Sequence, residues 1–305
     1  MSTEKKTYAE YRDLFLANVQ QFLPTRFLSW CMYQLTRIEA EWFKNPFIRN
    51  FMRMFNINLD EAEFSIAENY TSFNHFFTRA LKSGVRPLAP EPAMISPVDG
   101  TISQIGNIES GRIFQAKGHD YSVAELLGGE ANAAPFIGGD FATIYLAPYN
   151  YHRIHMPLTG TLGYWRYVPG RLFSVNAATV RAMPRVFARN ERVVAVFDTR
   201  CGPVAMVLVG ALFVGSIETV WAGQISPPHK RHDEAGNYVP MSPLQLLRGA
   251  EMGRFNMGST VILLSGAGRL RWKNDLKPGT TLRMGEALAL PDTSDATVQI
   301  RRGSV

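Results

Sequence analysis

Three short segments of the chain carry side chains that could act together in nucleophilic chemistry. They hold one aspartate in SPVDG, two histidines in YHRIHMP and one serine in MGST: Asp99, His152, His155 and Ser259. A serine hydroxyl is a weak nucleophile until a histidine accepts its proton, and an aspartate can orient and support that histidine. Asp99, His155 and Ser259 are therefore candidates for a catalytic triad, although their order along the chain does not show that they meet.

Each of these segments also has an ordinary structural interpretation. An aspartate before a glycine is a common turn former, and a Gly-Ser turn at the start of a strand is frequent. His152 and His155 would face opposite sides of a strand but could converge on a turn, and both could simply be buried and hydrogen-bonded. Because they follow the buried-looking strand ATIYLAP, they are equally candidates for general acid and base catalysis.

Other kinds of chemistry have weaker support. No third ligand has a spacing from the two histidines that favours a metal site, so we predict none. Cys31 and Cys201 are far apart in the sequence, which gives neither a zinc motif nor a disulfide framework. The glycine patterns of dinucleotide-binding folds and P-loops are missing, so no nucleotide cofactor is indicated.

Composition narrows the class of protein and the kind of partner. The 305 residues are 46% hydrophobic and 19% charged, which is typical of a globular protein with a real core. A net charge of +6 favours an acidic partner, but charge alone does not choose among nucleic acid, anionic lipid and an anionic substrate. The N-terminus lacks the apolar region of a secretory signal, and no apolar run approaches the roughly 20 residues of a membrane-spanning helix.

From about residue 93 the chain has the pattern of an antiparallel β core. Short runs rich in Val, Ile, Leu and Phe predict strands, with glycines recurring near their ends: Ala142–Leu146, Arg192–Phe197, Val204–Val214 and Thr260–Leu264. Only short helices are expected among them, at Ser122–Leu127 and around Pro243–Leu247. We therefore predict an α+β fold with two packed sheets, sandwich-like or barrel-like, and peripheral helices.

Residues 1–65 differ, because their aromatic residues recur at helical spacing. We predict helices broken at Pro24 and Pro46, the second with Thr25 as its N-cap. One interpretation is a helical subdomain that packs its apolar stripe on the rest of the protein. The other is an amphipathic unit that lies in a membrane interface, which the nearly all-round apolar second helix favours. We therefore divide the chain into an amphipathic helical membrane-associating region, 1–65, and a catalytic β-rich domain, 66–305.

Beyond residue 70 the segments together resemble the bacterial, proenzyme-type phosphatidylserine decarboxylases. Eight blocks occur in the family's order: FNHFFTRALKSGVRPL (73–88), SPVDGTISQIG (96–106), QAKGHDYSVAELLGG (115–129), YHRIHMP (151–157), YVPGRLFSVN (167–176), FARNERVVAVFDT (187–199), GALFVGSIETVWAG (210–223) and EMGRFNMGSTVI (251–262). Residues 1–65 share the family's character more than its wording. The processing motif of the family usually reads Leu-Gly-Ser-Thr, and here Met257, of similar size and polarity, replaces the leucine.

The resemblance implies a chain that cleaves itself between Gly258 and Ser259. Gly258 offers no side chain to block the attacking hydroxyl and tolerates strained backbone angles. The resemblance assigns proton removal from Ser259 to His155, with Asp99 orienting His155. Ester formation, β-elimination and hydrolysis would convert Ser259 to a covalent pyruvoyl cofactor, which forms a Schiff base with phosphatidylserine and accepts electrons as CO2 leaves. For His152 we predict protonation of the product carbon or positioning of the substrate carboxylate.

The same resemblance implies the partners and location of the protein. The β chain, 1–258, and the α chain, 259–305, would stay together, and two such pairs would form a homodimer. Phosphatidylserine and an anionic membrane surface are the expected partners, with no nucleic acid, at the cytoplasmic side of the inner cell membrane. The headgroup phosphate has only general candidates, each equally an ordinary surface residue: Arg153, Lys230, Arg231 and His232. The alternatives are a serine hydrolase that uses the same triad without self-cleavage and a non-catalytic membrane-binding β domain.

Overall fold

The computed structural model describes residues 8–213, 216–226 and 237–292. Strand residues make up 34% of the structure and helical residues 25%, so β-structure predominates. All the strand pairs within the sheets are antiparallel, and no sheet of the described residues closes into a barrel. The predicted α+β fold, with an antiparallel β core and an N-terminal helical unit, is confirmed, and its sheets remain open.

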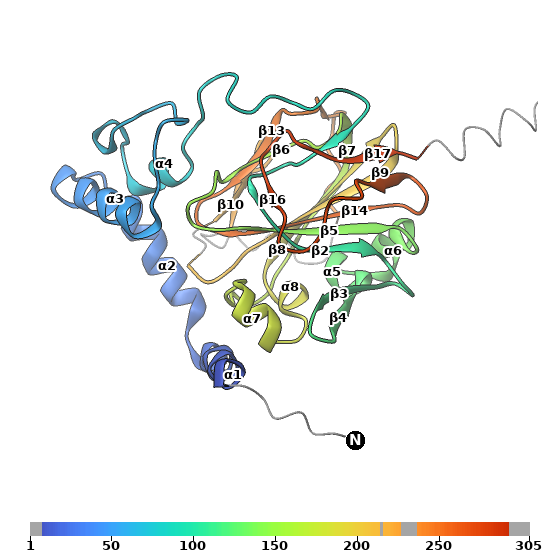
Figure 1. The fold of residues 1–305 in the computed structure, drawn as a ribbon, viewed down its shortest axis with the longest axis horizontal. Helices are drawn as coiled ribbons and strands as arrows, with labels where there is room; N and C mark the ends of the chain where they lie inside the picture. Colours follow the sequence, from blue (N-terminus) through green and yellow to red (C-terminus); the bar gives the residue numbers. More distant parts are fainter. Residues whose placement is uncertain (1–7, 214–215, 227–236, 293–305) are drawn as a thin grey trace, which may run out of the picture.

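An eight-stranded sheet forms the centre of the molecule (Figure 1). In spatial order its strands are β12 (Gln245–Leu246), β7 (Gly160–Val168), β8 (Arg192–Thr199), β9 (Gly202–Val209), β14 (Ser259–Ser265), β5 (Asp140–Leu146), β2 (Gly100–Asn107) and β16 (Thr281–Leu282). β14 lies between β5 and β9, and its pairing with β5 runs from Ser259 opposite Leu146 to Ser265 opposite Asp140. The strand that starts at the predicted cleavage site is therefore an interior strand.

Both faces of this sheet are buried, because successive side chains of a strand point to opposite sides. Along β14, Val261 and Leu263 belong to one hydrophobic core, whereas Ile262 and Leu264 belong to the other. The first core also includes side chains of two smaller sheets: β11 (Gly223–Ser226), β10 (Ile217–Thr219), β13 (Glu251–Phe255) and β6 (Arg153–His155) in one, and β1 (Met94–Ile95), β17 (Ala287–Pro291) and β15 (Leu270–Trp272) in the other.

The second core is closed by short helices and a two-stranded ribbon (Figure 1). Their bounds are β3 (Arg112–Ala116), β4 (His119–Ser122), α5 (Val123–Leu127), α6 (Glu130–Ala133), η2 (Ala134–Phe136), α7 (Ala177–Ala182) and α8 (Val186–Arg189). The predicted helix at Ser122–Leu127 is confirmed as α5. Ser122 caps it through a reciprocal pair of hydrogen bonds with Glu125, which satisfies two otherwise free backbone N–H groups.

The N-terminal helices follow one another along one side of the β body (Figure 1). They are α1 (Tyr8–Phe22), α2 (Thr25–Leu35), α3 (Glu41–Phe55), η1 (Ala67–Asn69) and α4 (Phe73–Phe77). α3 packs on the segment from Ile57 to Phe77 in a third core that is rich in phenylalanine, and Met257 lies against that core. The helical region therefore contacts Met257, the residue before Gly258 of the predicted cleavage site. Among the described residues, no helix is both long and apolar enough to cross a membrane.

Several large apolar side chains of α1 and α2 are exposed, whereas α3 also packs apolar side chains into the third core. On α1, Asp13 pairs with Arg181 of α7 at 2.7 Å, while Phe15 and Phe22 are 67% and 89% exposed. α2 buries Thr25 and Ser29, and its aromatic residues Phe27 and Trp30 are exposed. α1 and α2 therefore dock through polar and small residues, the opposite of what an ordinary core-facing stripe would do.

Three local predictions were wrong. Thr25 is the first residue of α2 rather than its cap, and its N-cap position is held by Pro24, which forms no side-chain cap. Pro46 lies inside α3 without ending it, because the helix begins only five residues earlier and the missing N–H removes a single hydrogen bond. Residues Pro243–Leu247 contain the edge strand β12, since Gln245 pairs with Thr161 of β7 and this pairing overrides local helix propensity.

Candidate active site

Asp99 lies in the loop before β2 and is only 7% exposed. Arg86 donates to both of its carboxylate oxygens, with Nε–Oδ1 at 3.0 Å and Nη2–Oδ2 at 2.5 Å, and the Met284 N–H donates to Oδ1 at 2.8 Å. Burial alone would lower the pKa of Arg86, but its hydrogen bonds to carboxylates, that of Asp99 foremost, outweigh burial and raise it. Gly100 is no turn former here: a Cβ on it would lie 2.6 Å from the Tyr145 carbonyl oxygen, so glycine permits β2 and β5 to approach.

His155 ends β6 and is almost fully buried. Its Nδ1 lies 2.8 Å from the carbonyl oxygen of Gly249, which can only accept, so Nδ1 carries the proton. The Nε2 lone pair then accepts from the hydroxyl of Tyr151 at 2.9 Å. Burial lowers the pKa of His155, whereas the hydrogen bond to Gly249 and the negative charges of Glu251 and, to a smaller extent, Asp99 act in the opposite direction. Asp99 is thus close enough to act on His155 electrostatically, but both imidazole nitrogens bond to other groups.

His152 has no exposed surface, and it lies next to the predicted cleavage site. Its Nδ1 donates to the carbonyl oxygen of Asn150 at 2.8 Å, and its ring packs on Phe77 with centroids 4.1 Å apart. Its Nε2 has no hydrogen-bond partner and lies 3.8 Å from the position that a Cβ on Gly258 would take. Burial, assisted by the positive charge of Arg79, lowers the pKa of His152 to about 3, so the ring is neutral and Nε2 is a free acceptor.

Gly258 and Ser259 lie where the chain enters the central sheet. The structure describes the backbone of Ser259, which pairs opposite Leu146, and its side chain lies outside the described part. Gly258 does not have a left-handed φ in the structure. A Cβ on Gly258 would meet the Leu146 carbonyl oxygen at 3.7 Å, an ordinary contact, which means that there is space beside this residue.

Two cavities of opposite character lie at the site, a polar one lined by Asp99 and Tyr151 and a mainly apolar one lined by Gly258. A polar cavity of about 420 Å³ is lined by Phe55, Asn56, Ile57, Asn58, Glu61, Ala62, Arg79, Leu81, Arg86, Asp99, Tyr149, Asn150 and Tyr151. A mainly apolar cavity of about 290 Å³ is lined by Phe51, Phe55, Phe77, Tyr145, Leu146, Pro148, Ser174, Val175, Asn176, Ala211, Leu212, Phe213, Met257 and Gly258. Phe55 lines both. An amphiphile with a polar head and an apolar tail matches this pair of cavities.

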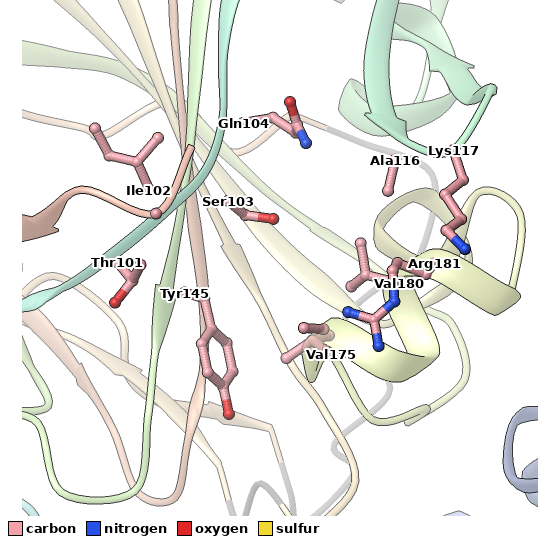
Figure 2. Close-up of a pocket in the computed structure, with 12 residues that line it drawn as sticks. Thr101, Ile102, Ser103, Gln104, Ala116, Lys117, Tyr145, Val175, Val180 and Arg181 are labelled. Atoms are coloured by element: carbon pink, nitrogen blue, oxygen red, sulfur yellow. The ribbon is translucent and has the colours of Figure 1, made fainter. Parts of the chain in front are cut away.

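A third cavity shares two lining residues with the apolar cavity, Tyr145 and Val175. It has a volume of about 420 Å³ and lies between β2 and α7, as Figure 2 shows. In that view Tyr145 and Val175 lie next to each other, and the charged ends of Lys117 and Arg181 lie on the α7 side.

Three side chains at the site were not predicted from the sequence. Arg86 holds Asp99, Tyr151 holds His155, and the buried Arg79 contacts the loop before His152 through the carbonyl oxygens of Tyr149 and Asn150, at 3.0 and 3.4 Å. No spacing rule connects Arg79 or Arg86 with the histidines, since the contacts are made across separate elements. The available signal was chemical: two arginines occur in the short run TRALKSGVR that follows an aromatic helix.

Of the four predicted phosphate candidates, the structure describes only Arg153. Arg153 donates to the Thr78 carbonyl oxygen at 2.9 Å and pairs with Glu251 at 2.9 Å, so its charge is already satisfied. Lys230, Arg231 and His232 lie outside the described residues. Within the part of the chain that the structure covers, no group of three His, Cys, Asp or Glu side chains is arranged to hold a metal ion.

Comparison with known proteins gives consistent matches over nearly the whole chain. A family model described as phosphatidylserine decarboxylase matches residues 73–290, and a second model, described as PSD, matches residues 16–56. A phosphatidylserine decarboxylase proenzyme from Pseudomonas fluorescens is 53% identical over 286 residues, which are 92% of this chain and 98% of that protein. The proenzyme of the same name from Nitrosococcus oceani is 54% identical over 279 residues, 91% of each chain.

By these matches, the chain belongs to a class of decarboxylase enzymes. Its antiparallel β core carries a buried Asp, two His and a Gly-Ser pair at the start of a strand. The chain is a member of the phosphatidylserine decarboxylase family. The resemblance inferred from the eight sequence blocks is confirmed by these matches.

Proposed function

We propose that this chain is a proenzyme that cleaves itself between Gly258 and Ser259 and then decarboxylates phosphatidylserine to phosphatidylethanolamine through a pyruvoyl group derived from Ser259. The observation that carries the proposal is the setting of this peptide bond. Gly258 leads into an interior strand and lies beside the unpartnered Nε2 of the buried His152. The names of the relatives, which include the word proenzyme, support it.

The self-cleavage that we propose needs only neighbouring groups of the chain and one water molecule. The Ser259 hydroxyl oxygen bonds to the Gly258 carbonyl carbon, and the peptide C–N bond breaks to give an ester and an amine. The two reacting groups belong to adjacent residues, so their effective concentration is high. Loss of the Ser259 α-proton then expels the Gly258 carboxylate from the β-carbon. Water adds at the α-carbon, ammonia leaves, and the new N-terminus is a pyruvoyl group.

We assign removal of the Ser259 hydroxyl proton to His155, with Asp99 as its electrostatic support. Burial lowers the pKa of His155 and keeps its imidazole neutral, which is the form that accepts a proton. The charge of Asp99 opposes this shift and would stabilise the imidazolium once it forms. Because the Tyr151 hydroxyl bonds to Nε2, it must rotate away from Nε2 or pass its own proton to it when His155 acts.

The surroundings of residue 259 fit a pyruvoyl group. There is free space beside Gly258, and the Nε2 of His152 is a buried polar atom without a partner. When formed, the group would supply an electron-poor carbonyl that takes the substrate amine and accepts the electron pair left by CO2. His152 would position the substrate or return a proton to its α-carbon. Since the pKa of His152 is lowered to about 3, proton donation requires the negative charge of the bound substrate to raise it.

The N-terminal helices would bring this site to the lipid. Their exposed aromatic and aliphatic residues include Phe22, Phe27, Trp30, Trp42 and Met54. When apolar side chains that are exposed along three successive helices enter the headgroup region of a bilayer, the free energy of the system falls. This favours the membrane-associating role of region 1–65 over that of an ordinary subdomain, and we propose a peripheral location at the cytoplasmic side of the inner membrane, where anionic lipid meets the basic chain.

Intact-mass spectrometry of the purified protein tests the self-cleavage. We expect two polypeptides, 1–258 and 259–305, with the smaller one lighter by one ammonia than simple hydrolysis would leave it. Ser259→Ala should remain uncut. A wild-type chain that stays whole after prolonged incubation contradicts the proposal, and labelling of that intact chain by a fluorophosphonate would identify a serine hydrolase instead.

The two histidines are separated by measuring cleavage and decarboxylation independently. We expect His155→Ala to abolish cleavage, and His152→Ala to permit cleavage but to remove release of CO2 from phosphatidylserine. His119→Ala, in the β3–β4 ribbon, is the matched control and should do neither. Cleavage that is lost with His152→Ala and kept with His155→Ala would reverse the assignment.

The assembly that we propose is a dimer of two cleaved chains. Both fragments of one chain should elute together in size-exclusion chromatography, at the mass of two complete chains. A single-chain mass at micromolar concentration would contradict the homodimer without bearing on the chemistry.

A further inference from the structure

Arg79 is a buried cation for which the described residues supply no counter-anion. Its side chain is 6% exposed, and no carboxylate of the described residues lies within ion-pair distance of it. Nη2 donates to two backbone carbonyl oxygens of the loop at Tyr149 and Asn150, and Nη1 has no hydrogen-bond partner. The guanidinium carbon also lies 5.5 Å from the ring centroid of Phe76, a cation–π contact. Burying a guanidinium without a counter-charge is unfavourable, so this arrangement favours binding of an anion.

The other charges at the polar cavity are already paired. Asp99 and Glu61 both accept from Arg86, and Glu61 also pairs with Arg283. Arg79 lines the same cavity of about 420 Å³. The two carboxylates and three guanidinium groups together carry a net charge of +1, and Arg79 is the one without an ionic partner among the described residues. An anionic ligand would complete the set.

Arg79 also lies next to the reacting centre. The Asn150 carbonyl oxygen that accepts from Arg79 accepts from His152 Nδ1 as well, at 2.8 Å. The opposite nitrogen of His152 lies beside Gly258. The Asn150 carbonyl group and the His152 ring therefore separate Arg79 from Gly258, and the inference below requires one headgroup to span that separation.

We infer that Arg79 binds the phosphodiester of the phospholipid headgroup, an inference that rests on the proposed function. A guanidinium matches the paired oxygens of a phosphate. The alternative anion is the substrate carboxylate, but its negative charge leaves the carboxyl group as CO2 forms. A cation bound there would stabilise the reactant more than the transition state and would slow the reaction. The phosphodiester keeps its charge throughout, so binding it holds the substrate without opposing decarboxylation.

Arg79→Met tests the inference in the cleaved enzyme, with phosphatidylserine in mixed micelles of fixed detergent ratio. Loss of a charge-assisted contact should raise KM by about 10- to 100-fold while kcat changes little, the pattern of lost uniform binding. Phosphatidylethanolamine retains the phosphodiester and lacks the carboxylate. Its inhibition constant as product should rise by the same factor. Cleavage of the proenzyme, which needs no headgroup, should proceed.

Arg79→Lys covers the case in which Arg79→Met does not fold or does not cleave. It keeps the charge but loses the fork of parallel donors, so KM and the product inhibition constant should both rise several-fold. Arg192→Lys is the matched control, because Arg192 is equally buried and bonds only to backbone carbonyl oxygens, two in α5 and two at the end of α8. It should leave both constants unchanged.

Several results would overturn the inference. An unchanged KM in cleaved Arg79→Met, or in Arg79→Lys if the first variant is unavailable for assay, excludes substrate binding by Arg79. A raised KM with unchanged inhibition by phosphatidylethanolamine assigns Arg79 to the carboxylate. Calorimetric titration with glycerophosphoethanolamine, which carries the phosphodiester alone among the acidic groups, decides the matter even if wild-type protein neither cleaves nor decarboxylates. Equal binding to wild type and Arg79→Lys would then refute it, separately from the proposed function.

Discussion

Replacing Gly258 by alanine tests whether the cleavage site needs a glycine, either because there is no room for a Cβ or because the backbone angle is one that only glycine adopts. Two features of the structure predict the effect of this substitution. The φ of Gly258 is one that any residue adopts, and an added Cβ would meet only two atoms within 4 Å, the Leu146 carbonyl oxygen at 3.7 Å and His152 Nε2 at 3.8 Å. Both are ordinary van der Waals distances. We therefore expect Gly258→Ala to fold and to cleave.

The magnitude follows from the same distances. Without a steric penalty, alanine stabilises the fold by about 0.4–1 kcal/mol, because the unfolded chain loses conformational freedom. For a chain of this size that raises Tm by about 1–3 °C. The cleavage rate should stay within about tenfold of wild type. Gly258→Val extends the side chain toward Leu146 and His152, and an overpacking penalty of about 1–3 kcal/mol would slow cleavage by about 10- to 100-fold.

The assay follows cleavage from the moment of synthesis. Cell-free translation is stopped at intervals, and the fractions of whole chain and of fragment 259–305 are quantified by intact mass. Thermal unfolding is measured in the Ser259→Ala background, which keeps every variant whole. Gly253→Ala is the control for steric reasoning, because its Cβ would lie 2.4 Å from the backbone oxygen of Glu218 across the β10–β13 pair. It should lose several degrees in Tm.

Two results would refute the reasoning. A Gly258→Ala chain that unfolds at the wild-type temperature and remains whole would show that glycine is required for a reason other than room for a Cβ. A Gly253→Ala chain as stable as its parent would show that distances to a constructed Cβ do not predict strain in these sheets.

Three further outcomes follow from features of the site and the helices. Asp99→Asn removes one partner of the buried pair with Arg86 and should lower the free energy of unfolding by about 2–4 kcal/mol, as urea titration would measure. Phe22→Ser combined with Trp42→Ser should reduce sedimentation with anionic vesicles at least severalfold, because 89% and 80% of these side chains are exposed. The pKa of His152 is lowered from 6.5 to about 3, so below pH 6.5 the unfolded state binds a proton that the folded state does not. The free energy of unfolding should then fall by about 1.4 kcal/mol per pH unit between pH 6 and 5, a share of the slope that His152→Phe removes.

Each of these outcomes has a control of the same kind elsewhere in the molecule. Asp120→Asn breaks an exposed ion pair in the β3–β4 ribbon and should lower the free energy of unfolding by less than about 1 kcal/mol. If Asp120→Asn and Asp99→Asn lowered it equally, burial would not explain the effect at Asp99. Val220→Ser with Leu247→Ser alters exposed apolar residues outside the helices and should leave vesicle binding intact. If it reduced vesicle binding as much as Phe22→Ser with Trp42→Ser, the helices would not be the membrane-binding part. His119→Phe should keep the full acid slope, and a flattened slope there would contradict the assignment to His152.

The β core could be predicted because its strands are continuous apolar runs, and both Arg192–Phe197 and Thr260–Leu264 lie within observed strands. The edge strand at Gln245–Leu246 could not, since two residues carry no periodicity and their conformation comes from pairing with β7. At the candidate site, the chemistry of Asp99 and His155 suggested one region, and Asp99 does influence the pKa of His155. Which hydrogen bond each nitrogen makes depends on side-chain orientation across separate elements, which no local pattern contains.

The position of β14 has a consequence for the life of the molecule after a cut before Ser259. Residue 259 starts a strand held by neighbours on both edges, and the later strands β16 and β17 are attached to β2 and β1. Two polypeptides would then share one cooperative fold that neither can form alone. Such a protein is assembled once, while it is still a single chain, and its persistence is set by its unfolding rate. After complete denaturation, recovery would require two separate chains to meet, so we expect it to depend on concentration and to be far less efficient than refolding of the uncut precursor.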